Sequence, residues 1–344
     1  MLIAADATYT LDPDPTGIAV YSKELLGGMA GAHPEAGFLF CYRPHRFLRS
    51  LSQRRLSNVW RWPLLDDGPR PGQLFHGLNQ RLPRKRWPLQ VTTFHDLFVM
   101  SQEYSAPEFR ARFTEQARHA AENADRIIAV SRFTASELER LLGVEPGRIR
   151  VIPHGVRVSS TIRAARERMV LSVGSIQKRK NSARLVRAFT AMPAGWRLVL
   201  AGGRGFGADE ALREAEASPR WPDIEVADHV SAARLQQLYA TASIFAFPSL
   251  DEGFGMPILE AMANGVPVVT SNRSAMPEVC GDAGVLVDPE NEEELASALR
   301  RLAGNAELRE DLAARGRDRA LQFSWDRAVK ETWAVYAELL RMNS

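Results

Sequence analysis

Two glutamates flank a glycine-rich turn in PSLDEGFGMPILEAMANGVPVVTSN, residues 248–272. Glu252 precedes the turn Gly253-Phe254-Gly255-Met256, and Glu260 follows it. Glycines let the backbone approach a ligand closely, and the amides at a helix start attract phosphate. A carboxylate on either side can accept hydrogen bonds from neighbouring hydroxyls of a sugar. The arrangement therefore suits a nucleotide-sugar, whose diphosphate lies between two sugars.

The alternative is that both glutamates only stabilise the start of a helix, which is worth about 0.3–1 kcal/mol each. Pro257 is expected at the first position of that helix, since proline lacks the amide hydrogen that this position does not use. Gly265 is expected to end it. Spacing alone does not separate the two interpretations, so the surrounding elements must decide.

Short apolar runs alternate with helical segments through the second half of the chain. Strand-like runs cover 169–174, 196–203, 243–249, 266–272 and 283–289, and helical spacing appears in 183–192, 209–217, 232–242, 257–264 and 292–304. Such alternation is typical of βαβ units, which form a parallel sheet covered on both faces. We predict a doubly wound, Rossmann-like α/β domain over residues 158–322.

The first half alternates less regularly and predicts a second Rossmann-like domain over residues 1–157. Its strand-like runs include 2–9, 37–43, 73–78, 89–96 and 126–131, and its helices are expected at 107–124 and 133–142. The basic stretch between 37–43 and 73–78 is expected to be irregular. The amphipathic C-terminal helix, 323–344, is predicted to pack back on this domain. The two domains are expected to face a central cleft.

Positive charge is concentrated in residues 41–90, which hold eleven basic and two acidic side chains. Arginines alternate there with leucine, phenylalanine and tryptophan, a composition that suits an anionic membrane surface or a phosphorylated partner. The alternative is a merely solvated face, because arginine is frequent throughout the chain. We find no nucleic-acid-binding module and no apolar run of membrane-spanning length. We expect no signal peptide, and two distant cysteines suggest a reducing, cytoplasmic setting.

Several stretches together resemble the retaining nucleotide-sugar glycosyltransferases of family four, which have the GT-B fold. The matching words are FPSLDEGFGMPILEAMANGVPVV, with seven residues between the two glutamates, together with SAMPEVCGDAGVLVDP, LSVGSIQKRKN, ADRIIAVSRFTASEL and VIPHGV. The resemblance covers nearly the whole chain, is weakest across 40–90, and favours bacterial mannosyltransferase-like members. It implies transfer of a hexose, mannose-like for preference, from a nucleotide diphosphate-sugar to a glycan or lipid-linked glycan.

The resemblance also implies roles for residues of the second, donor-binding domain. Glu260 would hold the nucleotide ribose, Glu252 would contact the transferred sugar, and the amides around Phe254, Gly255 and Met256 would meet the diphosphate. A basic residue after the first strand of this domain would neutralise the leaving phosphates, and Lys180 occupies that place. Many relatives have an arginine directly after Gly174, where this chain has Ser175. Arg179 is a second candidate for that charge, and which cation contributes most is left open.

In the acceptor-side first domain, the resemblance points to four positions. Gly17 would open a helix near the acceptor, and His95 would touch the donor sugar. Asp96 follows it at the end of a strand, where open parallel sheets hold ligands. Asp6, after the first strand, is a further acceptor-side candidate. For His95 the alternative is a structural role inside the core.

The scheme that follows requires no metal and no cofactor. Cations and amides would stabilise the departing phosphate, and the acceptor would attack on the same face of the sugar. Asp12-Pro13-Asp14 is interpreted as a turn and not as a metal site. We expect a cytoplasmic enzyme, peripheral at the inner face of the plasma membrane. A sugar-nucleotide 2-epimerase of the same fold and a non-catalytic sugar-nucleotide-binding protein are the alternatives.

Overall fold

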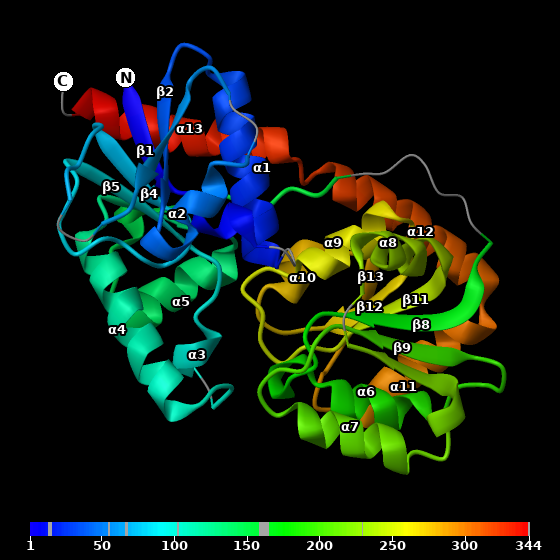
Figure 1. The fold of residues 1–344 in the computed structure, drawn as a ribbon. Helices are drawn as coiled ribbons and strands as arrows, with labels where there is room; N and C mark the ends of the chain where they lie inside the picture. Colours follow the sequence, from blue (N-terminus) through cyan, green and yellow to red (C-terminus); the bar gives the residue numbers. More distant parts are fainter. Residues whose placement is uncertain are drawn as a thin grey trace. The chain divides into compact units, whose positions relative to one another are not determined.

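The computed structural model describes residues 1–12, 16–53, 56–65, 68–101, 103–157, 165–228 and 230–342. The chain divides into two compact α/β units (Figure 1). The first unit contains Met1–Ser101, Pro107–Gly155 and Trp325–Ser344, and the second contains Gln102–Ala106 and Val156–Ser324.

Parallel strands form the sheet of the first unit, in the order β3-β2-β1-β4-β5-β6-β7. In chain order they are β1 (Leu2–Asp6), β2 (Gly37–Tyr42), β3 (Val59–Pro63), β4 (Leu74–Gly77), β5 (Leu89–Phe94), β6 (Arg126–Ala129) and β7 (Ile149–Val151). Every residue of β4 and β5 is buried. This is the burial expected of central strands in a sheet covered on both faces.

The main helices of this unit are α1 (Gly17–Ala32), α4 (Pro107–Asn123) and α5 (Arg132–Leu142), with short α3 (Phe98–Ser101) and the 3₁₀ turns η1 (Thr8–Leu11) and η2 (Pro146–Arg148). Helix α5 begins and ends at residues that are typical helix caps. The Ser131 hydroxyl caps α5 by accepting a hydrogen bond from the amide of Thr134 at 2.9 Å. Gly143 ends α5 with a φ of +63°, a conformation that glycine adopts without strain.

One expectation for the first unit is wrong. The basic stretch after β2 is not irregular, because it contains α2 (Pro44–Ser50) and β3. β3 lies at the edge of the sheet and ends in Pro63. Proline has no amide hydrogen to donate to a neighbouring strand, so it is tolerated in an edge strand. Because proline is rare in strands, its presence here makes the strand harder to predict from the sequence.

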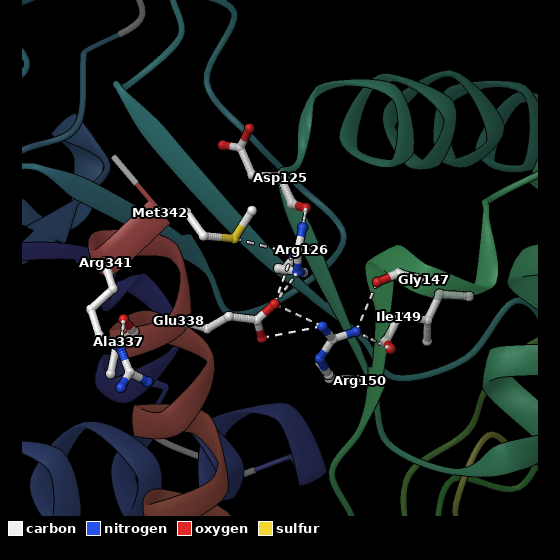
Figure 2. A network of polar contacts seen from close by, with 9 residues as sticks. All are labelled: Asp125, Arg126, Gly147, Ile149, Arg150, Ala337, Glu338, Arg341 and Met342. Atoms are coloured by element: carbon white, nitrogen blue, oxygen red, sulfur yellow. Dashed lines mark hydrogen bonds and ion pairs between the residues drawn. The ribbon is translucent and has the colours of Figure 1, made fainter. Parts of the chain in front are cut away.

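The C-terminal helix α13 (Trp325–Met342) belongs to the first unit. It packs against α1 so closely that a Cβ on Gly28 would lie 2.5 Å from Cγ2 of Val329. Figure 2 shows the Glu338 carboxylate of α13 between Arg126 of β6 and Arg150 of β7, whose Nη2 atoms each lie 2.8 Å from Oε1. The end of the chain is therefore fixed to the edge of the sheet by two charge-assisted contacts.

The second unit contains a parallel sheet of order β10-β9-β8-β11-β12-β13. Its strands are β8 (Glu167–Val173), β9 (Arg197–Ala201), β10 (Ile224–Ala227), β11 (Ala242–Phe247), β12 (Val268–Ser271) and β13 (Gly284–Val287). Its helices are α6 (Ser182–Phe189), α7 (Ala208–Ala217), α8 (Ala232–Thr241), α9 (Met256–Ala263), α10 (Met276–Cys280), α11 (Glu292–Gly304) and α12 (Ala306–Leu321), with 3₁₀ turns η3 (Lys178–Lys180) and η4 (Trp221–Asp223). Strand β10 and helix α12 were not anticipated from the sequence.

Both sheets are doubly wound, which confirms the predicted fold class. In each, successive strands run outward from a central strand, and the chain then returns to the other side of that strand. The order reverses between β1 and β4 in the first unit and between β8 and β11 in the second. Ligands of open α/β sheets bind beside the carboxyl ends of the strands at such a switch point.

Candidate functional site

Lys180 lies at the switch point of the second unit. Strand β8 ends at Val173, Gly174 follows with a φ of +129°, and the chain then forms the turn η3. The ammonium of Lys180 lies 4.4 Å from the ring centre of Phe247, the last residue of β11. A Cβ on Gly174 would lie 3.5 Å from that Nζ. The ends of β8 and β11 thus hold the ammonium between them.

Glu252 joins Lys180 and Arg179 in a buried charge cluster. Nη1 of Arg179 lies 2.6 Å from Oε1 of Glu252, and Nζ of Lys180 forms an ion pair with the same oxygen. Only 8% of Glu252 is exposed. Its burial raises the pKa, but the two cations outweigh that effect and lower the pKa to about 2. The cluster therefore carries two positive charges and one negative charge at neutral pH.

The loop that carries Glu252 is held in place by backbone contacts to two other loops. The amide of Leu250 donates to the carbonyl of Arg179 at 2.7 Å. The amide of Glu252 donates to Oγ of Ser274 at 3.1 Å. Ser274 has a φ of +48°, unusual for a residue other than glycine. Ser274 was not singled out in the sequence analysis, because the residues next to it in the sequence do not indicate a partner 22 positions away.

Asn181 ties together loops from three strands and was also missed. It has a φ of +59°, and its side-chain amide donates to the carbonyls of Pro248 at 3.1 Å and Pro289 at 2.7 Å. These prolines follow β11 and β13. Asparagine tolerates the left-handed conformation better than most residues. The only local signal was an asparagine immediately before a helical pattern.

The helix after the glycine turn begins one residue earlier than predicted. α9 starts at Met256, so Pro257 takes the second helical position and not the first. Gly255 precedes the helix with a φ of +104°. Within the described part of the chain, the amides of Gly255 and Met256 donate to no other group. Free amides at the positive end of a helix are the groups to which phosphate commonly binds in proteins.

Glu260 lies in the second turn of α9, and its hydrogen-bond partner is not a member of the Glu252 cluster. Its Oε2 accepts a hydrogen bond from the hydroxyl of Tyr239 on α8 at 2.8 Å. Burial raises the pKa of Glu260, and the hydrogen bond from Tyr239 lowers it in part. Tyr239 is a further residue of this site that the sequence did not reveal. Ser175, beside Gly174, is exposed.

The four residues singled out in the first unit follow or begin elements at its sheet. Asp6 ends β1, Gly17 begins α1, and His95 and Asp96 follow β5. The amide of Thr8 donates to Oδ1 of Asp6 at 3.0 Å. These residues belong to a different unit from the Glu252 cluster.

His95 is 8% exposed, and both of its ring nitrogens face polar groups. Nε2 lies 2.8 Å from the carbonyl of Leu78, and Nδ1 lies 3.3 Å from Nε2 of His154. Burial lowers the pKa of His95 to about 4, so the ring is neutral at pH 7. A neutral histidine whose Nε2 hydrogen is donated to Leu78 can position a neighbour but cannot supply a positive charge.

No group of three or more histidine, cysteine, aspartate or glutamate side chains that could hold a metal ion occurs among the described residues. Asp12 forms an ion pair with Arg46, while Pro13 and Asp14 lie outside the described residues. Within the same described ranges, no helix is long and apolar enough to cross a membrane.

Comparison with known proteins identifies the family. The model of the family "Glycosyl transferases group 1" matches residues 159–319, and that of "Glycosyltransferase Family 4" matches residues 68–160. O-antigen chain mannosyltransferase B of Escherichia coli is 32% identical over 93% of this chain and 96% of its own. The chain belongs to the group 1 glycosyl transferases.

Other relatives and structural neighbours of this glycosyltransferase have different names. D-inositol 3-phosphate glycosyltransferase of Actinosynnema mirum is 33% identical over 75% of this chain and 69% of its own. Among solved structures, sucrose-phosphate synthase of Thermosynechococcus elongatus has a TM-score of 0.79 at 21% identity, covering 99% of this chain and 100% of its own. An Anabaena protein in complex with UDP and glucose has a TM-score of 0.73 at 18% identity, covering 98% and 99%. These two structural matches show a shared fold. The family models and the Escherichia coli relative confirm the predicted family.

Proposed function

We propose that this glycosyltransferase moves a hexose, mannose for preference, from a nucleoside diphosphate-sugar to a glycan or lipid-linked glycan with retention of configuration. The observation that carries the proposal is the cluster of Lys180, Arg179 and Glu252 beside the start of α9, at the switch point of the second unit. The relative named as a mannosyltransferase and the Anabaena structure with UDP and glucose support it.

The cluster is suited to a leaving diphosphate. Negative charge grows on the phosphate as the glycosidic bond breaks, and preorganised cations and amides lower the barrier most where that charge develops. Lys180 and Arg179 supply the cations, and Gly255 and Met256 supply the amides. Because both cations already face Glu252, a diphosphate shares them with that carboxylate and does not meet them as free charges.

The remaining assignments follow the same scheme. Glu252, ionised at neutral pH, accepts hydrogen bonds from hydroxyls of the transferred sugar, and Glu260 accepts them from the ribose. The departing phosphate takes the proton of the attacking acceptor hydroxyl. Because Lys180, Arg179 and the amides neutralise the diphosphate in this scheme, it includes no metal. Dialysis against a chelator is then expected to leave turnover unchanged, and restoration of lost turnover by added Mg²⁺ or Mn²⁺ would contradict this part of the scheme.

The basic stretch offers a surface for an anionic membrane. Its apolar side chains include Leu48, 78% exposed, and Trp60, 53% exposed. Arginines lie beside them in α2. We propose that this face docks on the inner face of the plasma membrane. Sedimentation with anionic vesicles should show binding that weakens as salt rises, and no binding at low salt would rule this docking out.

The function is tested by a transfer assay after a thermal-shift panel. A nucleoside diphosphate that binds the folded chain raises its melting temperature and identifies the base of the donor. Lys180→Ala should then lose most of that shift and lower turnover by about 10²-fold. Lys178→Ala removes an exposed ammonium two residues away and should retain both. Equal behaviour of the two variants would contradict the assignment.

A further inference from the structure

The first unit contains a cavity beside the carboxyl ends of its central strands. The cavity, of about 590 Å³, is lined by Asp6 at the end of β1, Arg43 after β2, Arg81 and Arg84 after β4, and Arg112 on α4. These strands flank the point where the strand order reverses between β1 and β4. The fold thus places a cavity where a doubly wound sheet binds its ligands, in a different unit from the Glu252 cluster.

The lining of this cavity is positively charged. Four arginines face two carboxylates, Asp6 and Glu115, which leaves a net charge of +2 before either histidine of the lining is protonated. Asp6 is already engaged, since Nη2 of Arg43 lies 3.7 Å from its Oδ2 and the amide of Thr8 donates to its Oδ1. The cavity therefore favours an anion.

Arg81 is the residue of this cavity that most needs a partner. Its Nε is buried and has no hydrogen-bond partner among the described residues. No carboxylate in the described part of the chain pairs with Arg81 or with Arg84. A buried guanidinium hydrogen without an acceptor destabilises the folded chain, and a bound anion would supply the missing acceptor.

The backbone holds Arg81 in this position. Gly77 ends β4, and a Cβ there would lie 2.3 Å from the carbonyl oxygen of Arg81. The turn 77–81 is therefore so tight that only glycine fits at its start. Beside the arginines the cavity is lined by the apolar side chains Leu64, Phe75 and Leu82. It is larger than an inorganic anion needs and offers room for the organic group that carries one.

We propose that this cavity binds a phosphate group of the acceptor substrate, so that the enzyme glycosylates a phosphorylated acceptor. The planar guanidinium matches phosphate oxygens in pairs, and arginines from three different elements surround the cavity. The proposal rests on the proposed function, since it gives the chemical class of the acceptor. A sugar phosphate and a lipid-linked diphosphate share this chemistry.

The two sites can be tested separately with inorganic pyrophosphate. Isothermal titration calorimetry of the wild type should show two binding sites. Arg81→Ala should remove one of them or weaken it at least tenfold, and Lys180→Ala should remove the other. Lys23→Ala, which deletes an exposed lysine of α1 outside the cavity, should retain both. Two unchanged sites in Arg81→Ala would overturn this inference, whereas an unchanged titration in Lys180→Ala would count against the proposed function alone.

A second variant guards against a folding defect. Arg84 is exposed, so Arg84→Ala should fold normally and still weaken binding at the cavity at least threefold. Unchanged binding at the cavity in a folded Arg84→Ala would overturn the inference, even if Arg81→Ala does not fold.

The source of the phosphate is resolved by competition. In Lys180→Ala, where only the cavity binds, a hexose 1-phosphate or farnesyl diphosphate should displace pyrophosphate. Displacement by the first supports a sugar phosphate as the acceptor, and displacement by the second supports a lipid-linked diphosphate. Failure of both to compete would overturn the proposal.

Discussion

At the scale of single residues, the site depends on two cations that converge on one carboxylate oxygen. Arg179 and Lys180 both face Oε1 of Glu252. Without that carboxylate, two like charges would lie close together in a poorly hydrated place. With it, they are held ready at the strand ends where a diphosphate is expected. The sequence left open which cation matters more, and the structure gives both the same partner.

The stability of the chain should depend on pH through Glu252. Its pKa is about 2 in the folded chain against 4.5 ordinarily, so its contribution is complete above about pH 4.5 and is lost as the pH falls toward 2. A shift of this size corresponds to about 3 kcal/mol at most. Urea unfolding at pH 7 and pH 3 should show that the difference in unfolding free energy between wild type and Glu252→Gln narrows by about 2 kcal/mol at pH 3. Glu216→Gln, an exposed carboxylate of α7, should show no such narrowing, and a constant difference for Glu252→Gln would contradict the ion pairs.

Glu260 should discriminate between ribose and deoxyribose. If its carboxylate accepts hydrogen bonds from the ribose, a 2′-deoxynucleoside diphosphate should bind the wild type about 10-fold more weakly than the ribonucleotide. Glu260→Ala should bind both alike, as calorimetry can measure. Because burial raises the pKa of Glu260, the preference for ribose should also fade as the pH drops through that raised pKa. A variant that still prefers the ribonucleotide would contradict this role.

At the scale of elements, Asn181 fixes the loops that carry the cluster. Its side chain bonds to the loops after β11 and β13, and its own backbone has a left-handed conformation. The turn η3, which carries Arg179 and Lys180, ends at this residue. The geometry of the cations therefore depends on contacts made one residue further along.

Two substitutions at Asn181 separate side-chain from backbone effects. Asn181→Ala should lower the free energy of unfolding by about 2–4 kcal/mol, since it leaves the buried carbonyl of Pro248 without a donor, leaves that of Pro289 to Arg184 alone, and strains the backbone. Asn181→Gly loses the same hydrogen bonds without the strain, so its loss should be smaller by roughly 0.5–1 kcal/mol. Urea unfolding measures both. Equal losses would show that the backbone is not strained, and wild-type stability would show that the hydrogen bonds contribute nothing.

At the scale of the whole molecule, the doubly wound fold could be predicted because apolar runs and helical spacing alternate plainly along most of the chain. The structure of residues 44–63 could not be predicted, because prolines and arginines obscure the pattern of a short helix and an edge strand. That strand is defined by its pairing with β2, which the local sequence does not show. For the candidate site, Glu252 and Glu260 were singled out from residue type and spacing, and Lys180 from the resemblance to the family-four glycosyltransferases. Ser274, Asn181 and Tyr239 were missed, since each acts on a residue at least 21 positions away in the sequence.

The central claim is that the second unit binds a nucleoside diphosphate between Lys180 and the start of α9. A crystal structure of the enzyme with the nucleoside diphosphate chosen by the thermal-shift panel tests this most directly. We predict phosphate oxygens within hydrogen-bond distance of Nζ of Lys180 and of the amides of Gly255 and Met256, with Glu260 against the ribose. A nucleotide bound elsewhere, with residues 252–260 unoccupied, would contradict the account.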